Sequence, residues 1–477
     1  MVFLDITKAF DRVWHKGLFF KLQSFGITGN LLSWFKSYLS KRSQKVVLGG
    51  FSSALKRLFA GVPKGSILGP LLFFIFINDI EEGLTSDINL FADDTALCCE
   101  YSDVNSVEAV LNDDLERIDK WGAQWMVDFN PEKTVLINFS LKKRKSCPNI
   151  HFGDKVIMQV HSQKHLGVIL SEDMKWTLHI NHIRSKAYKK IGWLFGKSMY
   201  LSVEQKSLFY KSSIRPIIEY ASVIFDNCSI YNELDLDNVQ RRAALVCSGA
   251  IKRTETIKLI NDLEWDSLKT RRKRAKLVIF YKIKNGLVPN YLMNMLPVNE
   301  IRVERYNFRH VTTTLNIKIR LKCYETSFFP STYNLWNTLS ANILGSCSVN
   351  VFKKNLMRFS LFCDRFDRYP KSYLFGYCSG FYGRILNQIR YELSPLKSHL
   401  FTYGIVDDQM CPMCTDMIET TKHYFLECTS YLSGRTNLKN KLMELLASED
   451  IVYDQLLRFE SSNLLTVFFM WYGFRSK

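Results

Sequence analysis

Three aspartates lie at the ends of short apolar segments of the sequence. Asp5 follows the run 2–4, and Asp93 and Asp94 form a tight turn between the runs 88–91 and 95–98. Carboxylates that are brought together repel one another unless a divalent cation binds between them. Two Mg²⁺ ions on such carboxylates can stabilise the attacking and leaving oxygens of an in-line phosphoryl displacement. An Asp-Asp pair alone is more often an ordinary solvated turn, so this interpretation depends on the neighbouring residues.

A second set of residues that could do chemistry lies near the C-terminus. Cys411, Cys414, His423 and Cys428 offer three thiols and one imidazole at short intervals. These spacings allow a closed tetrahedral site, which predicts one structural Zn²⁺ ion. A redox CxxC pair or unrelated core cysteines are the alternatives. The remaining cysteines follow no framework, so we expect reduced thiols in an intracellular protein.

Composition limits the class of protein. The chain has 477 residues, a net charge of +18 and a pI near 9.3, and 47% of its residues are hydrophobic. A disordered basic tail is excluded by this apolar content, and the charge predicts a polyanionic partner. No apolar run reaches the roughly 18 residues that a membrane span needs, so no membrane partner is expected.

Positive charge is concentrated in residues 181–290, whose net charge is +11. Its densest part is a short cluster, where we expect nucleic acid to dock: Arg271, Arg272, Lys273, Arg274 and Lys276. A solvated helix face or a localisation signal would explain such a cluster equally well.

The pattern of apolar residues predicts a mixture of strands and helices. Spacings of three and four residues over 103–121 indicate an amphipathic helix. Strands are expected at 88–91, 95–98 and 135–139, and another from Leu166 onward. From about residue 181 the pattern is mostly helical. The fold class is therefore α+β.

Five motifs follow one another in a fixed order. They are DITKAFD from Asp5, GVPKGSILGPLLF from Gly61, FADD from Phe91, NPEKT from Asn130 and HLGV from His165. Their forms and order resemble the palm of reverse transcriptases from non-LTR (LINE-type) retrotransposons, in particular the jockey and chicken-repeat-like branches. Segments 215–221, 239–243 and 333–337 resemble the thumb and the region after it, and 386–390 and 398–401 resemble a following zinc-binding region.

The resemblance implies a role for each matching residue. Asp5, Asp93 and Asp94 would hold two catalytic Mg²⁺ ions, and Lys133 would help pyrophosphate to leave. Phe10 would exclude a 2′-hydroxyl and so select deoxynucleotides. Gly65 and Ser66 would let the backbone approach template and nucleotide, and Lys64, where the family usually has Gln, would contact template phosphate. Leu166 and Gly167 would belong to the primer grip.

The resemblance also implies an architecture and an activity. We expect a right-hand polymerase palm at 1–175, a helical thumb at 176–300, a connecting region at 301–385 and a zinc-binding, nucleic-acid-binding region at 386–477. Finger strands that the family places before Asp5 would be mostly missing, as in a 5′-truncated copy. The expected reaction is RNA-directed DNA synthesis from dNTPs on template RNA with a DNA primer or target. We expect the protein in the nucleus at least transiently, and the cytoplasm is also possible. The alternative is a catalytically inactive remnant that binds nucleic acid.

Overall fold

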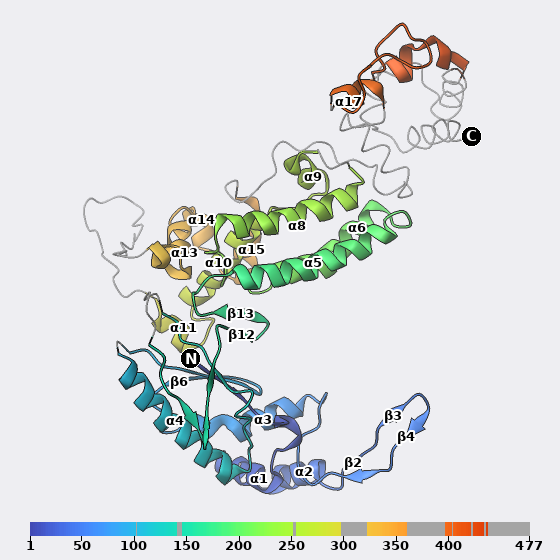
Figure 1. Cartoon of the computed structure of the whole chain (residues 1–477). Coiled ribbons are helices and arrows are strands. Elements are labelled where there is room, and N and C mark those ends of the chain that lie inside the picture. Colours follow the sequence, from blue (N-terminus) through green and yellow to red (C-terminus); the bar gives the residue numbers. More distant parts are fainter. Residues whose placement is uncertain are drawn as a thin grey trace, which may run out of the picture. The chain divides into compact units, whose positions relative to one another are not determined.

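A computed structural model describes residues 1–101, 103–140, 146–250, 254–296, 322–359, 396–402, 404–420, 423–433 and 436. The chain divides into two compact units, Met1–His179 and Ile180–Lys477, and each is described by itself (Figure 1). Of the expected connecting region 301–385, only residues 322–359 are described. The segment 386–390 lies outside the described residues. Within the described parts, no helix is both long and apolar enough to cross a bilayer.

A five-stranded sheet forms the centre of the first unit, with the strand order β11-β8-β1-β7-β6. Strand β1 (Val2–Asp5) pairs antiparallel with β7 (Asp94–Cys98) and with β8 (Val135–Leu136). Strand β6 (Asp87–Phe91) pairs antiparallel with β7, whereas β11 (Met158–Gln159) runs parallel to β8. The expected strands at 88–91 and 95–98 are confirmed, and the strand expected at 135–139 is only two residues long.

Both faces of β1 are buried, which explains why its sequence is apolar without alternation. Val2 and Leu4 join a large core with residues of α1 (His15–Ser24), α3 (Leu68–Ile77) and α4 (Val104–Trp125). Phe3 points to the opposite face and joins a smaller core with Ala96, Val135 and Ile137. The next residue, Asp5, is half-buried and ends the strand.

Helix α4 begins where the sequence predicts. The side chain of Asp103 caps it by accepting a hydrogen bond from the amide of Ser106 at 2.8 Å. The remaining elements of this unit are η1 (Ala9–Asp11), α2 (Gly29–Leu39), β2 (Ser43–Gln44), β3 (Val47–Leu48), β4 (Phe51–Ser52), β5 (Lys56–Arg57), η2 (Asn78–Glu81), β9 (His151–Phe152), β10 (Lys155–Val156), β12 (Ser162–His165) and β13 (Val168–Ser171).

A buried cation ties α1 to α3 in this unit. The ammonium of Lys21 donates to the carbonyl of Phe76 at 2.6 Å and to Asp79 Oδ1 at 2.5 Å, and it lies 3.7 Å from the centroid of the Trp125 ring. Trp121 Nε1 donates to the same Asp79 oxygen at 2.9 Å. Burial lowers the pKa of Lys21, and the Asp79 carboxylate opposes that shift.

Strands β2 to β5 form a narrow two-stranded extension, the ribbon, which covers residues 43–57. Ser43 and Gln44 pair with Arg57 and Lys56, and nearer the tip Val47 and Leu48 pair with Ser52 and Phe51. Gly49 and Gly50 close the tip with φ values of 55° and 86°. Two successive positive φ angles suit a tight hairpin turn, in which glycine avoids strain. In Figure 1 the ribbon extends away from the rest of this unit.

The second unit is helical in its described parts. Helix α10 (Leu268–Lys284) is central, because Leu277, Phe280 and Tyr281 pack against residues of α13 (Phe328–Trp336) and α15 (Val349–Arg358). The remaining elements are α5 (Thr177–Lys197, which begins in the first unit), α6 (Val203–Phe209), η3 (Tyr210–Ile214), α7 (Arg215–Glu219), α8 (Ile230–Ser248), α9 (Thr256–Asp262), α11 (Asn290–Asn294), α12 (Lys322–Glu325), α14 (Ala341–Leu344), α17 (Lys397–Thr402), η6 (His423–Glu427) and η7 (Thr429–Tyr431).

The buried carboxylate of Asp114 gives a prediction about the fold. It accepts hydrogen bonds from the amides of Thr85 and Ser86, each at 2.8 Å, and from the Ser86 hydroxyl, so it joins α4 to the start of β6. Asp114→Ala leaves these donors buried without a partner, at a cost of about 2 kcal/mol or more. We expect amide hydrogen exchange in β6 to accelerate by at least tenfold, measured by mass spectrometry on the full chain. Asp114→Asn keeps one acceptor and should accelerate exchange less; equal exchange in all three proteins would contradict this role.

Candidate functional site

The antiparallel pairing of β1 with β7 places two carboxylates opposite each other. Asp5 is the last residue of β1, Asp94 is the first residue of β7, and the two are register partners. Directly opposed residues of an antiparallel pair have Cα atoms about 4.5 to 5.5 Å apart. Asp93 precedes Asp94 in the turn, after Ala92 with a φ of 53°. Asp93 and Asp94 are exposed and Asp5 is half-buried, so solvent and ions can reach all three.

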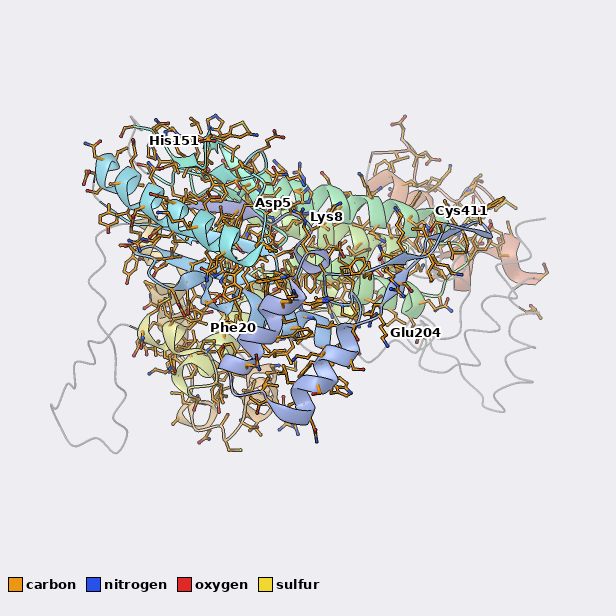
Figure 2. All side chains as sticks on the ribbon, turned by 90° about the horizontal axis from the view of Figure 1, so that it is seen from below. Asp5, Lys8, Phe20, His151, Glu204 and Cys411 are labelled. Atoms are coloured by element: carbon orange, nitrogen blue, oxygen red, sulfur yellow. The ribbon has the colours of Figure 1, made fainter. Side chains whose placement is uncertain are left out.

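This arrangement suits a divalent cation. Like charges held this close by the backbone favour a counter-charge, and carboxylate oxygens are the ligands that Mg²⁺ prefers. Lys8, in the turn after β1, has a φ of 51°, and Figure 2 labels Asp5 and Lys8 on this segment. The register therefore places Asp5 and Asp94 opposite each other at one end of the sheet, with Asp93 next to Asp94 in the chain, and the ligation of Mg²⁺ by the three carboxylates stays a prediction.

A turn at Asn130 brings Lys133 to the carboxylates. The amide of Asn130 donates to the Asp5 carbonyl at 2.8 Å, and the Asn130 carbonyl accepts from the amides of Lys133 and Thr134 at 3.2 and 3.0 Å. Lys133 Nζ then lies 3.7 Å from Asp5 Oδ2. The Lys133 side chain is largely exposed and the Asp5 side chain is half-buried, so this ion pair adds little stability and leaves the ammonium able to move toward a ligand. Sequence reasoning missed the role of Asn130, which the first position of the NPEKT motif could have indicated.

The loop 61–66 is held against the segment that follows Asp5. The amide of Val62 donates to the Phe10 carbonyl at 2.8 Å, and the Phe10 ring stacks on Phe73 with centroids 4.8 Å apart. Ser66 Oγ donates to the Pro63 carbonyl at 2.8 Å and accepts from the amide of Gly69 at 2.9 Å, in the first turn of α3. Gly65 and Ser66 lie in the loop just before this helix, which begins at Leu68.

Lys64 lies in the same loop and is paired within the protein. Its Nζ is 2.7 Å from Asp11 Oδ2, and both side chains are more than half exposed. Such a pair is weak, so the Lys64 ammonium can exchange Asp11 for a phosphate.

Leu166 and Gly167 do not begin a strand, which corrects that expectation. They form the turn between β12 and β13, where His165 pairs with Val168. Leu166 has a φ of 46° and Gly167 a φ of 82°. The ring of His165 lies 5.1 Å from the ring of Phe3 on β1, so the turn is adjacent to the sheet that carries the carboxylates. Burial lowers the pKa of His165 and the Asp94 charge opposes this shift.

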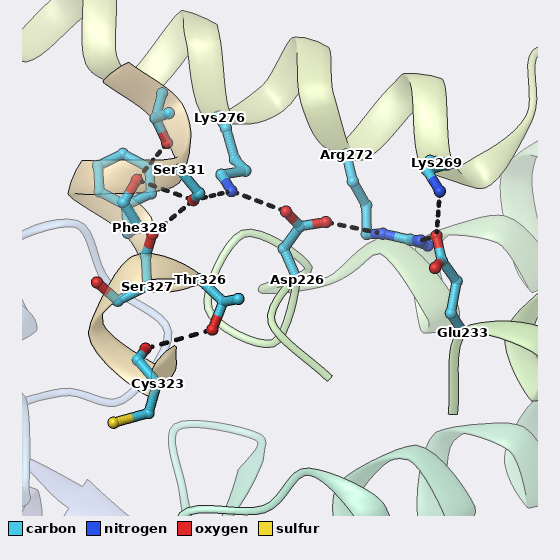
Figure 3. A network of polar contacts seen from close by, with 11 residues as sticks. Asp226, Glu233, Lys269, Arg272, Lys276, Cys323, Thr326, Ser327, Phe328 and Ser331 are labelled. Atoms are coloured by element: carbon cyan, nitrogen blue, oxygen red, sulfur yellow. Dashed lines mark hydrogen bonds and ion pairs between the residues drawn. The ribbon is translucent and has the colours of Figure 1, made fainter. Parts of the chain in front are cut away.

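Most charges of the basic cluster on α10 are paired within the protein, and its contact with nucleic acid stays a prediction. Arg272 is 4% exposed and binds Asp226 and Glu233, and Lys276 binds Asp226 at 2.8 Å and Ser331 Oγ at 2.6 Å (Figure 3). Arg271 pairs with Glu219, and Arg274 pairs with Asp266 at 2.7 Å. A buried cation requires a local partner. Arg271, Arg272 and Lys276 therefore link α10 to other segments, whereas Arg274 binds Asp266 directly before the same helix. Lys273 has no ion pair among the described residues.

Cys411, Cys414, His423 and Cys428 come together near the C-terminus. Their ligand atoms all lie within 4.8 Å of one another. Cys411 Sγ is 3.8 Å from Cys428 Sγ, and Cys414 Sγ is 3.3 Å from His423 Nε2. A tetrahedral ion with bonds of about 2.3 Å separates two sulfurs by about 3.8 Å, whereas a disulfide separates them by about 2 Å. The donor set therefore fits a four-coordinate metal and not a Cys411–Cys428 disulfide.

Backbone hydrogen bonds shape this cluster. The amide of Cys411 donates to the Met417 carbonyl at 2.8 Å, and Thr415 has a φ of 61° in the turn between the first two cysteines and Met417. Backbone amides of Asp416 and Met417 lower the pKa of Cys414, while burial raises the pKa of Cys411. A metal ligand must be a thiolate, so these amides favour binding at Cys414.

Glu419 anchors the cluster to α17 and was missed by sequence reasoning. Its side chain is 3% exposed, and its Oε2 accepts from the amide of Lys397, the first residue of α17, at 2.8 Å. The Glu419 carbonyl accepts from Ser398 Oγ at 2.7 Å. No sequence pattern identifies Glu419, because a glutamate between ligands is usually exposed.

Gly61 provides a test of how the loop is held. It has a φ of +88°, and a Cβ there would lie 2.7 Å from the Asp11 carbonyl oxygen. Gly61→Ala should therefore push the loop away from Phe10, and we expect at least tenfold faster hydrogen exchange at the amide of Val62. The control is Gly65→Ala, which has a φ of +80° but meets no atom within 4 Å. It carries the backbone strain without the clash. Equal acceleration by both variants would attribute the effect to strain alone.

Comparison with known proteins agrees with this geometry. The sequence model of the family described as "Reverse transcriptase (RNA-dependent DNA polymerase)" matches residues 1–170. The RNA-directed DNA polymerases from mobile element jockey of Drosophila melanogaster and Drosophila funebris are 31% and 32% identical to this chain over 234 residues, which is 47% of this chain and 25% of each relative.

A third relative is the probable RNA-directed DNA polymerase from transposon X-element of Drosophila melanogaster, 29% identical over 284 residues, or 55% of this chain and 28% of the relative. The chain spans about a quarter of the length of these curated relatives. The family match, the order of the motifs and the opposed carboxylates all fall in the first unit. Residues 1–170 therefore belong to the reverse transcriptase family, and their relatives are the polymerases of non-LTR, LINE-type retrotransposons.

Proposed function

We propose that this chain is an RNA-directed DNA polymerase of a non-LTR retrotransposon. The observation that carries the proposal is the register of β1 and β7, which opposes Asp5 and Asp94 inside a domain of the reverse transcriptase family. The names of the relatives support the same activity. Template RNA, primer or target DNA, and dNTPs are the proposed partners. A chromosomal target would put the reaction in the nucleus at least transiently, and the cytoplasm is the other proposed location.

The carboxylates and Lys133 carry the proposed chemistry. Asp5, Asp93 and Asp94 would hold two Mg²⁺ ions, which supply Lewis-acid stabilisation of the phosphoryl transition state when bound. The primer 3′-hydroxyl oxygen loses its proton and bonds to the α-phosphorus of a dNTP, while the bond from that phosphorus to pyrophosphate breaks. Lys133 Nζ, 3.7 Å from Asp5 Oδ2, is placed to stabilise the negative charge on the departing pyrophosphate.

The residues around loop 61–66 would position the substrates. We assign Phe10 to the exclusion of a 2′-hydroxyl, and its stacking on Phe73 supports this because a braced ring cannot swing away from a clash. Gly65 and Ser66 would approach the nucleotide, Lys64 would contact template phosphate, and the turn at Leu166 and Gly167 would hold the primer end.

The remaining regions of the chain would bind nucleic acid as well. We propose a palm at 1–175, a helical thumb at 176–300, a connecting region at 301–385 and a zinc-binding region at 386–477. Cys411, Cys414, His423 and Cys428 would hold one structural Zn²⁺. The 3.8 Å separation of two of their sulfurs supports this, and the closed site would stabilise a segment too small to fold around an apolar core.

Primer extension tests the polymerase. The purified full chain should add labelled deoxynucleotide to a DNA primer on an RNA template with Mg²⁺. Asp93→Asn with Asp94→Asn should reduce the rate by about 1,000-fold or more, because metal-held charge is worth several kcal/mol in the transition state. Asp113→Asn with Asp119→Asn, which removes two exposed carboxylates of α4, is the matched control and should extend at the parent rate.

Binding separates the alternatives. Primer–template affinity of the same proteins is measured by fluorescence anisotropy. Binding without extension by the parent would identify a nucleic-acid-binding protein that has lost catalysis, and the polymerase proposal would be rejected.

Metal analysis tests the zinc site. The purified chain should contain about one zinc per molecule by mass spectrometry, and Cys411→Ser with Cys414→Ser should remove it. The matched control is Cys147→Ser with Cys323→Ser, two exposed cysteines outside the cluster, which should retain the zinc. A parent without zinc whose Cys411 and Cys414 react as a reversible disulfide would support the redox alternative instead.

A further inference from the structure

One stretch of the first unit has positive charge and no negative charge. Residues 12–78 contain ten Lys and Arg and neither Asp nor Glu. The rest of this unit mixes the two signs, as on α4, where Arg117 and Lys120 pair with Asp113 and Glu116. Cations in such a region are neutralised only where the fold brings carboxylates from other segments to them, and cations left without such a partner attract an anionic ligand.

The ribbon holds part of the charge that is not neutralised within the described residues. Lys16, Lys36, Lys41 and Arg42, outside the ribbon, also have no ion pair there. Arg12, Lys21 and Lys64 are paired with Asp128, Asp79 and Asp11. In contrast, Lys45, Lys56 and Arg57 on the ribbon are exposed, and none of the three has an ion pair among the described residues. Every residue from Ser43 to Arg57 is exposed, so the whole ribbon is open to a partner.

The ribbon also exposes large apolar side chains. Leu48 and Phe51 are cross-strand partners at the tip, and they are 79% and 84% exposed. Phe59, two residues beyond the ribbon, is 82% exposed. Val46, Val47 and Leu55 of the ribbon are also exposed, and large apolar side chains exposed side by side mark an interaction surface. The hairpin turn at Gly49 and Gly50 keeps the tip strands paired while exposing these residues.

The ribbon is directly connected to the proposed active site. Its last strand ends at Arg57, and four residues later the chain enters loop 61–66, whose Val62 amide is bonded to Phe10. Each strand arm of the ribbon, 43–49 or 51–57, has seven residues, and seven residues of extended chain span about 23 Å. The ribbon can therefore follow a strand of nucleic acid over several nucleotides from the site.

We propose that the ribbon binds the unpaired template strand before it reaches the carboxylates. Lys45, Lys56 and Arg57 contact its phosphates, and Phe51 and Phe59 stack on its bases. Stacking requires free base faces, which a duplex covers with neighbouring base pairs, so the exposed rings favour an unpaired strand. The inference rests on the proposed function, because it takes the partner of a polymerase as the ligand.

Binding of unpaired RNA to the full chain tests the inference. Affinity is measured by anisotropy at several salt concentrations, with EDTA and without dNTP, so that loss of catalysis cannot affect the result. Lys45→Gln with Lys56→Gln and Arg57→Gln should weaken binding and reduce the slope of log Kd against log salt by about 2, since each phosphate contact on a single strand contributes about 0.7. Phe51→Ala should weaken binding about fivefold or more for the single strand, and less for a blunt duplex.

The control removes the same charge elsewhere in this unit. Arg117→Gln, Lys120→Gln and Lys155→Gln remove three exposed cations that are already paired with Asp113, Glu116 and Glu132. This variant should keep the parent slope. Parent-like binding by the ribbon variants would overturn the inference, and so would equal loss of single-strand and duplex binding by Phe51→Ala. If the ribbon variants lost binding to phosphatidylserine vesicles but bound RNA as the parent does, the inference would also be overturned, in favour of a membrane surface.

Discussion

The antiparallel pairing of β1 with β7 is the constraint on which the rest of the first unit depends. It sets Asp5 opposite Asp94, and a shift of one residue would turn Val2 and Leu4 out of one core and Phe3 out of the other. The two buried faces of β1 prevent that shift. Apolar packing therefore fixes the position of two charges that would otherwise separate, and this enforced closeness favours a counter-charge between them.

The surroundings of the carboxylates are organised by backbone hydrogen bonds rather than by side chains. The turn at Asn130 bonds to the Asp5 carbonyl, and loop 61–66 bonds to Phe10 through the amide of Val62. Backbone bonds position Lys133 and Phe10 while leaving their side chains available to a substrate. The same principle applies at the cysteine cluster, where amides orient the thiols.

Positive charge has two different uses in this chain. On α10, Arg272 and Lys276 are buried and their carboxylate partners come from other parts of the second unit, so the charges stabilise helix packing. On the ribbon, Lys45, Lys56 and Arg57 have no acidic neighbours and stay in solvent. Neither the density of Lys and Arg nor the lack of acidic residues nearby in the sequence distinguishes these uses, because residues 267–299 around α10 also contain no Asp or Glu. The fold makes the difference, because it brings Asp226 and Glu233 to the cations of α10.

The sequence by itself determined the features that depend on local pattern: the helix capped by Asp103, the two strands around Asp93 and Asp94, and the motif order that places Asp5 with them. The spacing of Cys411, Cys414, His423 and Cys428 likewise predicted a cluster that the structure assembles. Only the tertiary structure decided that the α10 cluster is internal, that Leu166 and Gly167 form a turn, and that Asp114 and Glu419 are buried anchors. The physical reason is that capping, strand alternation and ligand spacing act over a few residues, whereas the partner of a buried charge lies tens of residues away, as Arg272 and Asp226 do.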